Sequence, residues 1–184
     1  MDRAEWLEWR RKGIGGSDIA AILGISPWST PLQIYLQKIG EGGEVEENER
    51  MRWGRRLEPA ILDELEEECG YVIEERGSTA IKGVLRGTLD AYTECGCVIE
   101  VKTTQNGQVW QQGIPLYYQA QVQHYMHISG FPGAVVAVLI AGSQLELHML
   151  DYNPAVGARI EEAATQFWQQ HVEPRIPPAP NSVA

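Results

Sequence analysis

The chain has 184 residues and a mass of 20.5 kDa, which fits a single domain with its own core. Its 25 acidic residues outnumber its 15 basic ones, and the formal net charge of −10 excludes a generally basic coat for nucleic acid. The longest apolar run covers residues 134–141, far short of the roughly 20 residues of a membrane-spanning helix, so we expect no membrane association.

Two further features indicate the compartment. The first residues lack a basic stretch followed by an apolar one, so we expect no secretory signal. Three cysteines are too few for a disulfide framework, which agrees with a reducing environment. We therefore expect a cytoplasmic protein.

Helical patterns fill the first part of the chain. Apolar spacing, capping residues and glycine stops predict helices at residues 2–12, 18–23, 31–40 and 47–69. Ser17 is the expected cap of the second helix, and Pro31 starts the third. Pro59 lies inside the fourth helix, where we expect it to kink or break the chain.

The pattern changes to short strands after Gly70. Strands are predicted at residues 71–76, 85–91, 98–103, 134–140 and 145–150, with helices at 115–128 and about 154–171. The run 134–140 is apolar at every position, as in a strand covered on both faces. This order predicts an α/β fold with a mixed central β-sheet flanked by helices. We expect one domain over residues 1–173 and a proline-rich tail over 174–184.

Polar residues interrupt two of these strands in a pattern that favours a metal site. Side chains alternate along a strand, so Glu100 and Lys102 share one face while Val101 points to the other. Asp90 ends the preceding strand of the same hairpin. Carboxylate oxygens suit Mg²⁺ or Mn²⁺, and the main-chain carbonyl of Val101 is a further candidate ligand. An ordinary ion pair on an exposed strand face is the alternative.

Four motifs in the same order resemble a known family. They are Trp6 to Asp18 with its Gly-Ile-Gly-Gly-Ser-Asp, Gly54 to Pro59, the set Asp90, Glu100 and Lys102, and Gln121 to Tyr125. Over residues 4–172 the chain resembles the phage-type alkaline exonucleases of the YqaJ and lambda-exonuclease family, within the PD-(D/E)xK nuclease superfamily. Leu89 stands where the superfamily pattern has proline. The resemblance implies a restriction-endonuclease-like core.

The resemblance also implies a role for each residue of the metal site. Asp90 and Glu100 would bind the metal with help from the Val101 carbonyl, and Glu58 would hold or orient a second Mg²⁺ ion. Mn²⁺ could substitute for Mg²⁺. Lys102 would position or help deprotonate the attacking water and stabilise charge on the phosphate. The alternative for Glu58 is one more acid on an acidic helix.

Helical spacing places Gln121 and Tyr125 on one face of a helix. The resemblance puts Gln121 beside the metal centre, and it makes Tyr125 and His124 candidate DNA contacts. The alternative is that Tyr125 belongs to the core. His124 and His127 lie three residues apart, but Mg²⁺ avoids imidazole, so we expect them at the surface or facing DNA.

Arg10, Arg11 and Ser17 flank the glycine turn at residues 13–16. Guanidinium groups, a hydroxyl and free backbone amides make a candidate phosphate pocket, and the alternative is a capped helix with solvated arginines. By resemblance this region would bind the 5′-phosphate of the degraded strand. Which of the two arginines does so stays open.

The implied activity is a Mg²⁺-dependent 5′-to-3′ exonuclease on linear double-stranded DNA. It would release mononucleotides and leave a 3′ single strand for an annealing protein in phage recombination. A ring-shaped homotrimer, encoded by a phage or prophage in a bacterial host, would carry out the reaction. The alternatives are a RecB-like or restriction-like endonuclease module and a catalytically silent DNA-binding subunit.

Overall fold

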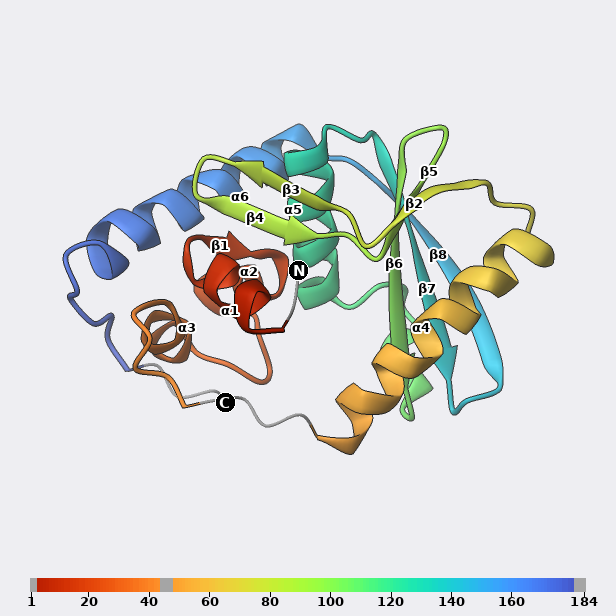
Figure 1. The fold of residues 1–184 in the computed structure, drawn as a ribbon, viewed down its shortest axis with the longest axis horizontal. Helices are drawn as coiled ribbons and strands as arrows, with labels where there is room; N and C mark the ends of the chain where they lie inside the picture. The colour runs from red at the N-terminus through yellow and green to blue at the C-terminus, as the bar shows by residue number, and fades with distance from the viewer. Residues whose placement is uncertain (1–2, 44–47, 181–184) are drawn as a thin grey trace.

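The computed structural model describes residues 3–43 and 48–180, which form two β-sheets with helices packed on and between them (Figure 1). The larger sheet has five strands in the order β2-β5-β6-β7-β8. Their bounds are β2 Ile73–Arg76, β5 Ala91–Thr93, β6 Cys97–Thr104, β7 Gly133–Ile140 and β8 Gln144–Asp151. Only β6 and β7 pair in parallel, so the sheet is mixed, as predicted.

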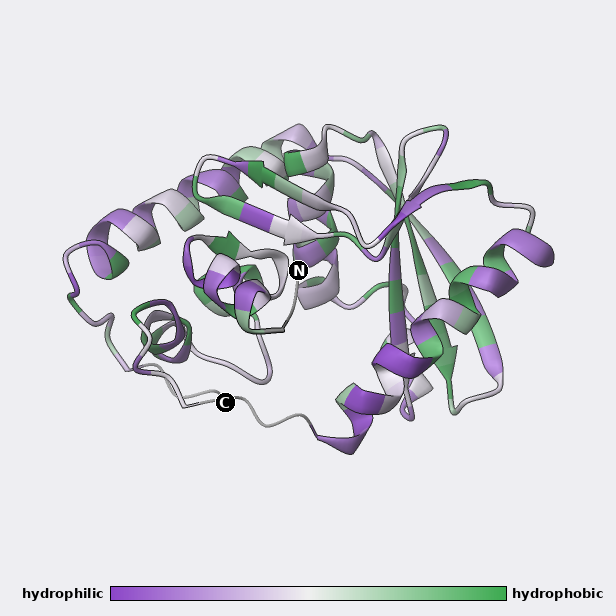
Figure 2. Ribbon diagram, viewed as in Figure 1, coloured by the Kyte–Doolittle hydropathy of each residue, from purple (hydrophilic) through white to green (hydrophobic). Residues whose placement is uncertain are grey.

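Two helices cover the larger sheet. Helix α4 (Glu49–Glu67) packs its apolar side on one face through Ile61, Leu62 and Leu65, which meet Ile99 and Val101 of β6. Helix α5 (Leu116–Ser129) is the crossover between β6 and β7, and its residues Val122 and Met126 lie in the core on the other face. Strand β7 is therefore buried from both sides, and Figure 2 shows it almost continuously apolar.

The smaller sheet has the order β1-β4-β3, with β1 Ile14–Gly15, β3 Thr79–Lys82 and β4 Leu85–Thr88. The helices gathered beside it are α1 Arg3–Arg11, α2 Gly16–Ile22, α3 Pro31–Lys38 and α6 Pro154–Phe167, the last continued by the π-helical turn Trp168–Val172 (Figure 1). A second apolar core joins α2, α3 and α6 through Ile19, Ile34 and Ile160.

Most predicted elements are confirmed, and the differences have physical causes. Of the kink or break expected at Pro59, no break occurs, because helix α4 runs on through it and packs on β6. The kink stays a prediction. The predicted start of this helix at residue 47 lies outside the described residues. The strand predicted at 85–91 is two strands, β4 and β5, because Leu89 and Asp90 carry the chain from one sheet to the other.

Ser17 is not the cap of α2. The cap is Gly15, which has no side chain to accept a hydrogen bond, and the Asp18 carboxylate accepts one from the Gly15 N–H. The prediction therefore placed the helix start two residues late.

The remaining expectations concern the ends of the chain and its environment. The π-helical turn ends at Val172, and residues 176–180 have no regular structure, while the domain boundary at residue 173 stays a prediction. Across residues 3–43 and 48–180, no helix has the length and apolar character needed to cross a bilayer. Cys69, Cys95 and Cys97 are free thiols.

Candidate active site

The candidate site lies just past the segment of β6 that pairs with β5. Here Asp90, Glu100 and Lys102 come together. The Asp90 Oδ2 atom accepts a hydrogen bond of 2.8 Å from the main-chain N–H of Val101. Beside it, the Glu100 Oε1 atom accepts a bond of 2.6 Å from the Lys102 ammonium. Because Asp90 lies at the crossing between the two sheets, its backbone is tied to both and its carboxylate is held against β6.

Glu100 is buried rather than exposed, since α5 covers the polar face of β6. The residue is 2% exposed, and its Oε1 atom also accepts a bond of 2.9 Å from Gln121 on α5. Its Oε2 atom is buried and has no hydrogen-bond partner among the described residues. A buried carboxylate oxygen without a partner is costly, which points to a ligand that completes it.

Glu58 joins this group from α4. It lines an open cavity of about 330 Å³, whose other residues are Arg50, Met51, Gly54, Val101, Lys102 and Thr103. The first turns of α4 and the end of β6 thus enclose a space with Lys102 and Glu58 on opposite walls. Gly54 of α4 lies close to Thr103 of β6, since a Cβ atom there would be in van der Waals contact, at 3.4 Å, with the Thr103 hydroxyl.

Burial raises the pKa values of all three carboxyl groups, and repulsion from Asp90 adds to this effect for Glu100 and Glu58. Burial and the neighbouring Asp90 raise the pKa of Glu100 to about 8 and that of Glu58 to about 7. Burial also raises the pKa of Asp90, against the effect of Lys102. Burial opposes the charge of Lys102 as well, but Glu100 and Asp90 outweigh it and raise its pKa, so Lys102 stays an ammonium. A charged Lys102 suits charge stabilisation better than proton abstraction.

These residues fit a hard divalent cation. Three carboxyl groups face one buried ammonium, and the unpartnered Glu100 Oε2 atom is a free oxygen donor of the kind that Mg²⁺ and Mn²⁺ prefer. Within the described parts of the chain, no three imidazole, thiol or carboxylate groups are arranged so that they alone could hold a metal ion. Water or a substrate phosphate would therefore complete the coordination, as is common for Mg²⁺.

Gln121 lies beside this group, as predicted, whereas Tyr125 is not at the surface. The Gln121 Nε2 atom donates both to Glu100 and to the Tyr125 hydroxyl, at 2.9 and 3.0 Å. Tyr125 is 7% exposed and packs against Gly16 of α2 and Gly87 of β4, where a Cβ atom would clash with its ring. The prediction that Tyr125 contacts DNA is wrong, and the core alternative holds.

His124 also lies in the interior. It is 0% exposed, and its Nε2 atom donates to the Arg86 carbonyl at 2.8 Å. Burial lowers the pKa of His124 to about 4, so the ring is neutral. The prediction of a surface or DNA-facing His124 is wrong, because β4 covers this side of α5. His127 is half-buried and bonded to Tyr152 and Glu161.

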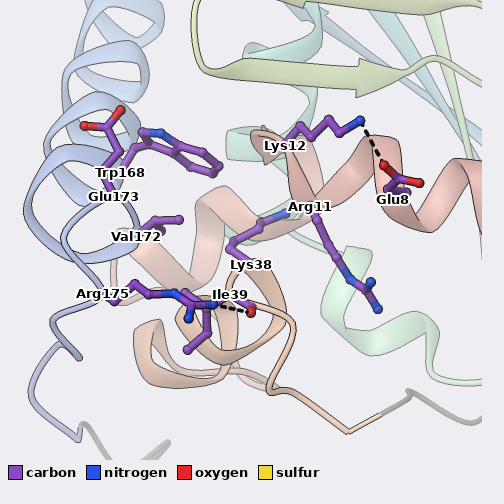
Figure 3. Close-up of a pocket in the computed structure, with 9 residues that line it drawn as sticks. All are labelled: Glu8, Arg11, Lys12, Lys38, Ile39, Trp168, Val172, Glu173 and Arg175. Atoms are coloured by element: carbon purple, nitrogen blue, oxygen red, sulfur yellow. Dashed lines mark hydrogen bonds and ion pairs between the residues drawn. The ribbon is translucent and has the colours of Figure 1, made fainter.

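The two arginines of the predicted phosphate pocket lie apart. Arg10 donates to the Ser17 hydroxyl at 2.5 Å and to Asp18 at 3.1 Å. Arg11 instead lies at the edge of a hollow of about 340 Å³ beside Lys38 and Trp168, and Figure 3 shows its guanidinium extending away from that tryptophan. Arg10, and not Arg11, is therefore the partner of Ser17.

Sequence reasoning missed the buried ion cluster that holds Arg10. Lys38 and Asp18 form an ion pair of 2.6 Å with side chains 2% and 1% exposed. Burial opposes the charge of Asp18, but Lys38 and Arg10 outweigh it and lower the pKa. Asp18 also accepts a hydrogen bond from the Gly15 amide, whereas the amides expected to meet a phosphate are those after Gly15. The acid three residues after Gly15 was the available signal.

The Arg10 region and the carboxylates are linked through α5. The close approach of Gly16 to the Tyr125 ring brings α2 directly against α5, and Tyr125 contacts Gln121, which contacts Glu100. One helix thus carries the contacts between the two groups. The hydroxyl of Thr88, two residues before Asp90, is buried without a partner in the described structure.

Comparisons with known proteins agree with this fold. With 94% of each chain covered, the fold matches that of the alkaline exonuclease LHK-Exo from Laribacter hongkongensis with a TM-score of 0.78 at 18% identity. The same enzyme in complex with dAMP matches with a TM-score of 0.77. A phage-related exonuclease from Haemophilus somnus 129PT matches with a TM-score of 0.66 at 13% identity, covering 86% of this chain and 94% of that one.

The family follows from the sequence itself. Residues 5–132 match the model of the YqaJ-like viral recombinase domain. The uncharacterized protein YqaJ of Bacillus subtilis (strain 168) is 32% identical over 94% of this chain. The chain belongs to the YqaJ and lambda-exonuclease family, and it spans 57% of the length of that curated relative.

Proposed function

We propose that this chain is a nuclease that needs a divalent cation and digests linear double-stranded DNA from its 5′ ends. The observation that carries the proposal is the group of three carboxyl groups around one buried ammonium, with a carboxylate oxygen left without a partner. The alkaline exonucleases that share its fold, and the recombinase family to which it belongs, support the same class of reaction.

Asp90, Glu100 and Glu58 would hold Mg²⁺, or Mn²⁺ in its place, as one or two ions. When bound, the metal supplies positive charge that activates water and neutralises the phosphate. Lys102 offers its ammonium to the phosphate oxygens, and its bond to Glu100 keeps it in place. Gln121 acts through Glu100, whose Oε1 atom it orients.

Hydrolysis would add a water oxygen to phosphorus and break the bond from phosphorus to the 3′ oxygen of the terminal nucleotide. The water proton leaves to solvent, and the 3′ oxygen takes up a proton as a mononucleotide departs. The shortened strand then carries a new 5′-phosphate. LHK-Exo has been solved with dAMP, a mononucleotide of this kind.

End selectivity would come from Arg10 with Ser17. A terminal phosphate carries more charge than an internal one and gains more from a guanidinium. The contacts from Arg10 through Ser17 and α2 to α5 support a 5′-phosphate position next to the carboxylates. Bonded to both Ser17 and Asp18, the Arg10 side chain is still 32% exposed and able to take a further partner.

A processive enzyme of this kind would act as a ring. A compact chain of this length has a radius of gyration of ~16 Å, too small to surround a duplex alone, which supports a homotrimer. Phage-type recombination further implies an annealing protein that receives the 3′ strand, in the cytoplasm of a bacterial host. Free thiols at all three cysteines are compatible with that compartment.

Digestion of a linear duplex labelled on one strand, with Mg²⁺ and with a chelator, tests the proposal. We expect Mg²⁺-dependent loss of nucleotides from the 5′ end and an intact 3′ strand. Cleavage of covalently closed circles would support the endonuclease alternative instead. Binding without cleavage in Mg²⁺ would support the catalytically silent alternative.

A further inference from the structure

A group of aromatic side chains lies beside Lys102 and plays no part in the chemistry described so far. Its members are Trp28, Trp110, Tyr117 and Tyr118, which we call the aromatic row. Trp110 is 2% exposed and stacks on Tyr118 with ring centroids 5.5 Å apart. At the other end, Trp28 contacts Tyr117 at 4.6 Å and Tyr118 at 5.8 Å. The row thus passes from the core to the surface.

Trp28 is held in place yet open to solvent. It precedes α3 in a turn whose amides at Trp28 and Ser29 donate to the Ser26 hydroxyl. The residue is 62% exposed, although the Tyr117 ring packs edge-on against its indole. Such a braced, exposed indole offers a flat face at low entropic cost, because the turn and the tyrosines already fix it.

The aromatic row is continuous with the proposed active site. The Lys102 ammonium lies 4.8 Å from the centroid of the Tyr118 ring. Only Tyr118 therefore separates the exposed Trp28 ring from the ammonium that would meet the scissile phosphate. In a DNA strand, bases lie next to the phosphates that join them, so a strand with a phosphate at Lys102 has bases within reach of the row.

We propose that Trp28, supported by Tyr117 and Tyr118, is a stacking platform for a base near the cleaved phosphate of the DNA strand. This inference rests on the proposed function. Aromatic rings hold single-stranded bases by stacking with little regard to sequence, which suits an enzyme that removes every nucleotide in turn. Trp28 is a positioning residue here, since the phosphate meets Lys102 and the metal ligands instead.

The test combines a protein change with a matching change in the DNA. Linear duplexes are prepared with normal or abasic nucleotides at the 5′ end, and KM and kcat are measured. For the unmodified protein, the abasic end should raise KM by about 10- to 100-fold, the range expected for one lost stacking contact. Trp28→Ala should raise KM on the normal end similarly and remove the further effect of the abasic end. Trp28→Phe should restore most of the discrimination.

Met149→Ala is the control, because Met149 is 79% exposed and alternates along β8 with His148, so its side chain points to the opposite face from the residue that contacts Trp110 of the row. It should keep the full abasic effect. The inference is overturned if the Trp28→Ala protein still distinguishes normal from abasic ends. If that variant also sediments differently from the unmodified protein, this surface is a protein interface instead. If the unmodified protein cleaves no duplex, the proposed nuclease function fails, and equilibrium binding of the same duplexes decides the role of Trp28.

Discussion

Two buried charge clusters in this molecule have opposite balances. In the amino-terminal cluster, one acid, Asp18, faces two bases, Lys38 and Arg10, and the pKa of the acid falls. In the carboxylate cluster, Glu58, Asp90 and Glu100 face the single ammonium of Lys102, and the pKa values of all three acids rise. Asp18 and Glu100 are 1% and 2% exposed, whereas Glu58, Asp90 and Lys102 are half-buried. The pKa falls in the more deeply buried cluster, so burial alone does not explain the difference.

The opposite ratio of acids to bases indicates that the amino-terminal cluster stabilises the fold and that the carboxylate cluster binds a ligand. The Asp18 oxygens are fully used, by Lys38, Arg10 and the Gly15 amide. Glu100 keeps a buried oxygen without a partner in the described residues. A cluster with more acids than bases and an unpaired carboxylate oxygen destabilises the fold by itself. A bound cation would offset that cost, which is why such clusters are found at functional sites. Four predictions test this contrast.

Lys102→Ala should have the largest effect on activity. Removing the ammonium takes away a main stabiliser of charge on the phosphate, so kcat should fall by about 10²–10³-fold or more. The fold should survive, because Glu100 with its raised pKa can become neutral. Initial rates and thermal melts measured together check this. Near-normal turnover by a folded Lys102→Ala protein would contradict the proposed mechanism.

Asp18→Asn should instead act on stability. It leaves the buried Lys38 ammonium without its carboxylate, which costs about 3–5 kcal/mol when one partner of a buried pair is removed. The melting temperature should fall by roughly 10 °C for a chain of this size. Asp63→Asn, which removes a half-exposed acid paired with Arg76, is the control and should change it little. Equal melting temperatures for both variants would show that the amino-terminal cluster is not structural.

The carboxylate cluster should make stability depend on pH and on metal. Since folding raises the pKa of Glu58 to about 7 and of Glu100 to about 8, the folded protein binds more protons than the unfolded chain above pH 4.5. The metal-free protein should therefore lose stability as the pH rises from about 5 to about 9. Mg²⁺ should restore more of it at the alkaline end, where the ligands are ionised. Calorimetric melts check this, and an equal effect of Mg²⁺ at both ends would contradict it.

The smallest expected effect is on the preference for 5′-phosphorylated ends, in which Arg10→Ala and Arg11→Ala should differ. Because Arg10 is the arginine that contacts Ser17, its loss should reduce the preference for 5′-phosphorylated over 5′-hydroxyl ends by about 10-fold, the value of one charge-assisted hydrogen bond. Arg11→Ala should leave the preference intact. Rates on the two kinds of end measure it. The same loss in both variants would contradict the assignment to Arg10.

Part of the site could be predicted from the sequence because it depends on local geometry. Strand alternation alone places Glu100 beside Lys102, and helical spacing alone places Gln121 beside Tyr125. The four motifs then led to Glu58 and Asp90, whose neighbours are distant in the chain.

The burial of α5 could not be predicted in the same way. This helix packs against both sheets as well as α2 and α6, so it has no solvent face for the sequence pattern to reveal. Its polar residues are instead satisfied by segments far along the chain: Gln121 by Glu100, Gln123 by Asp151 and His124 by Arg86. The same limit applies to Lys38, whose partner Asp18 lies on another helix.

The central claim is that the carboxylate cluster binds a divalent cation through Asp90. Calorimetric titration of Mn²⁺ at alkaline pH into the unmodified protein, Asp90→Asn and Asp63→Asn tests it most directly, since both variants lose one negative charge. The account predicts saturable binding with proton release for the unmodified protein and for Asp63→Asn, and its loss in a folded Asp90→Asn protein. Equal binding by all three proteins, or no binding by any of them, would contradict it.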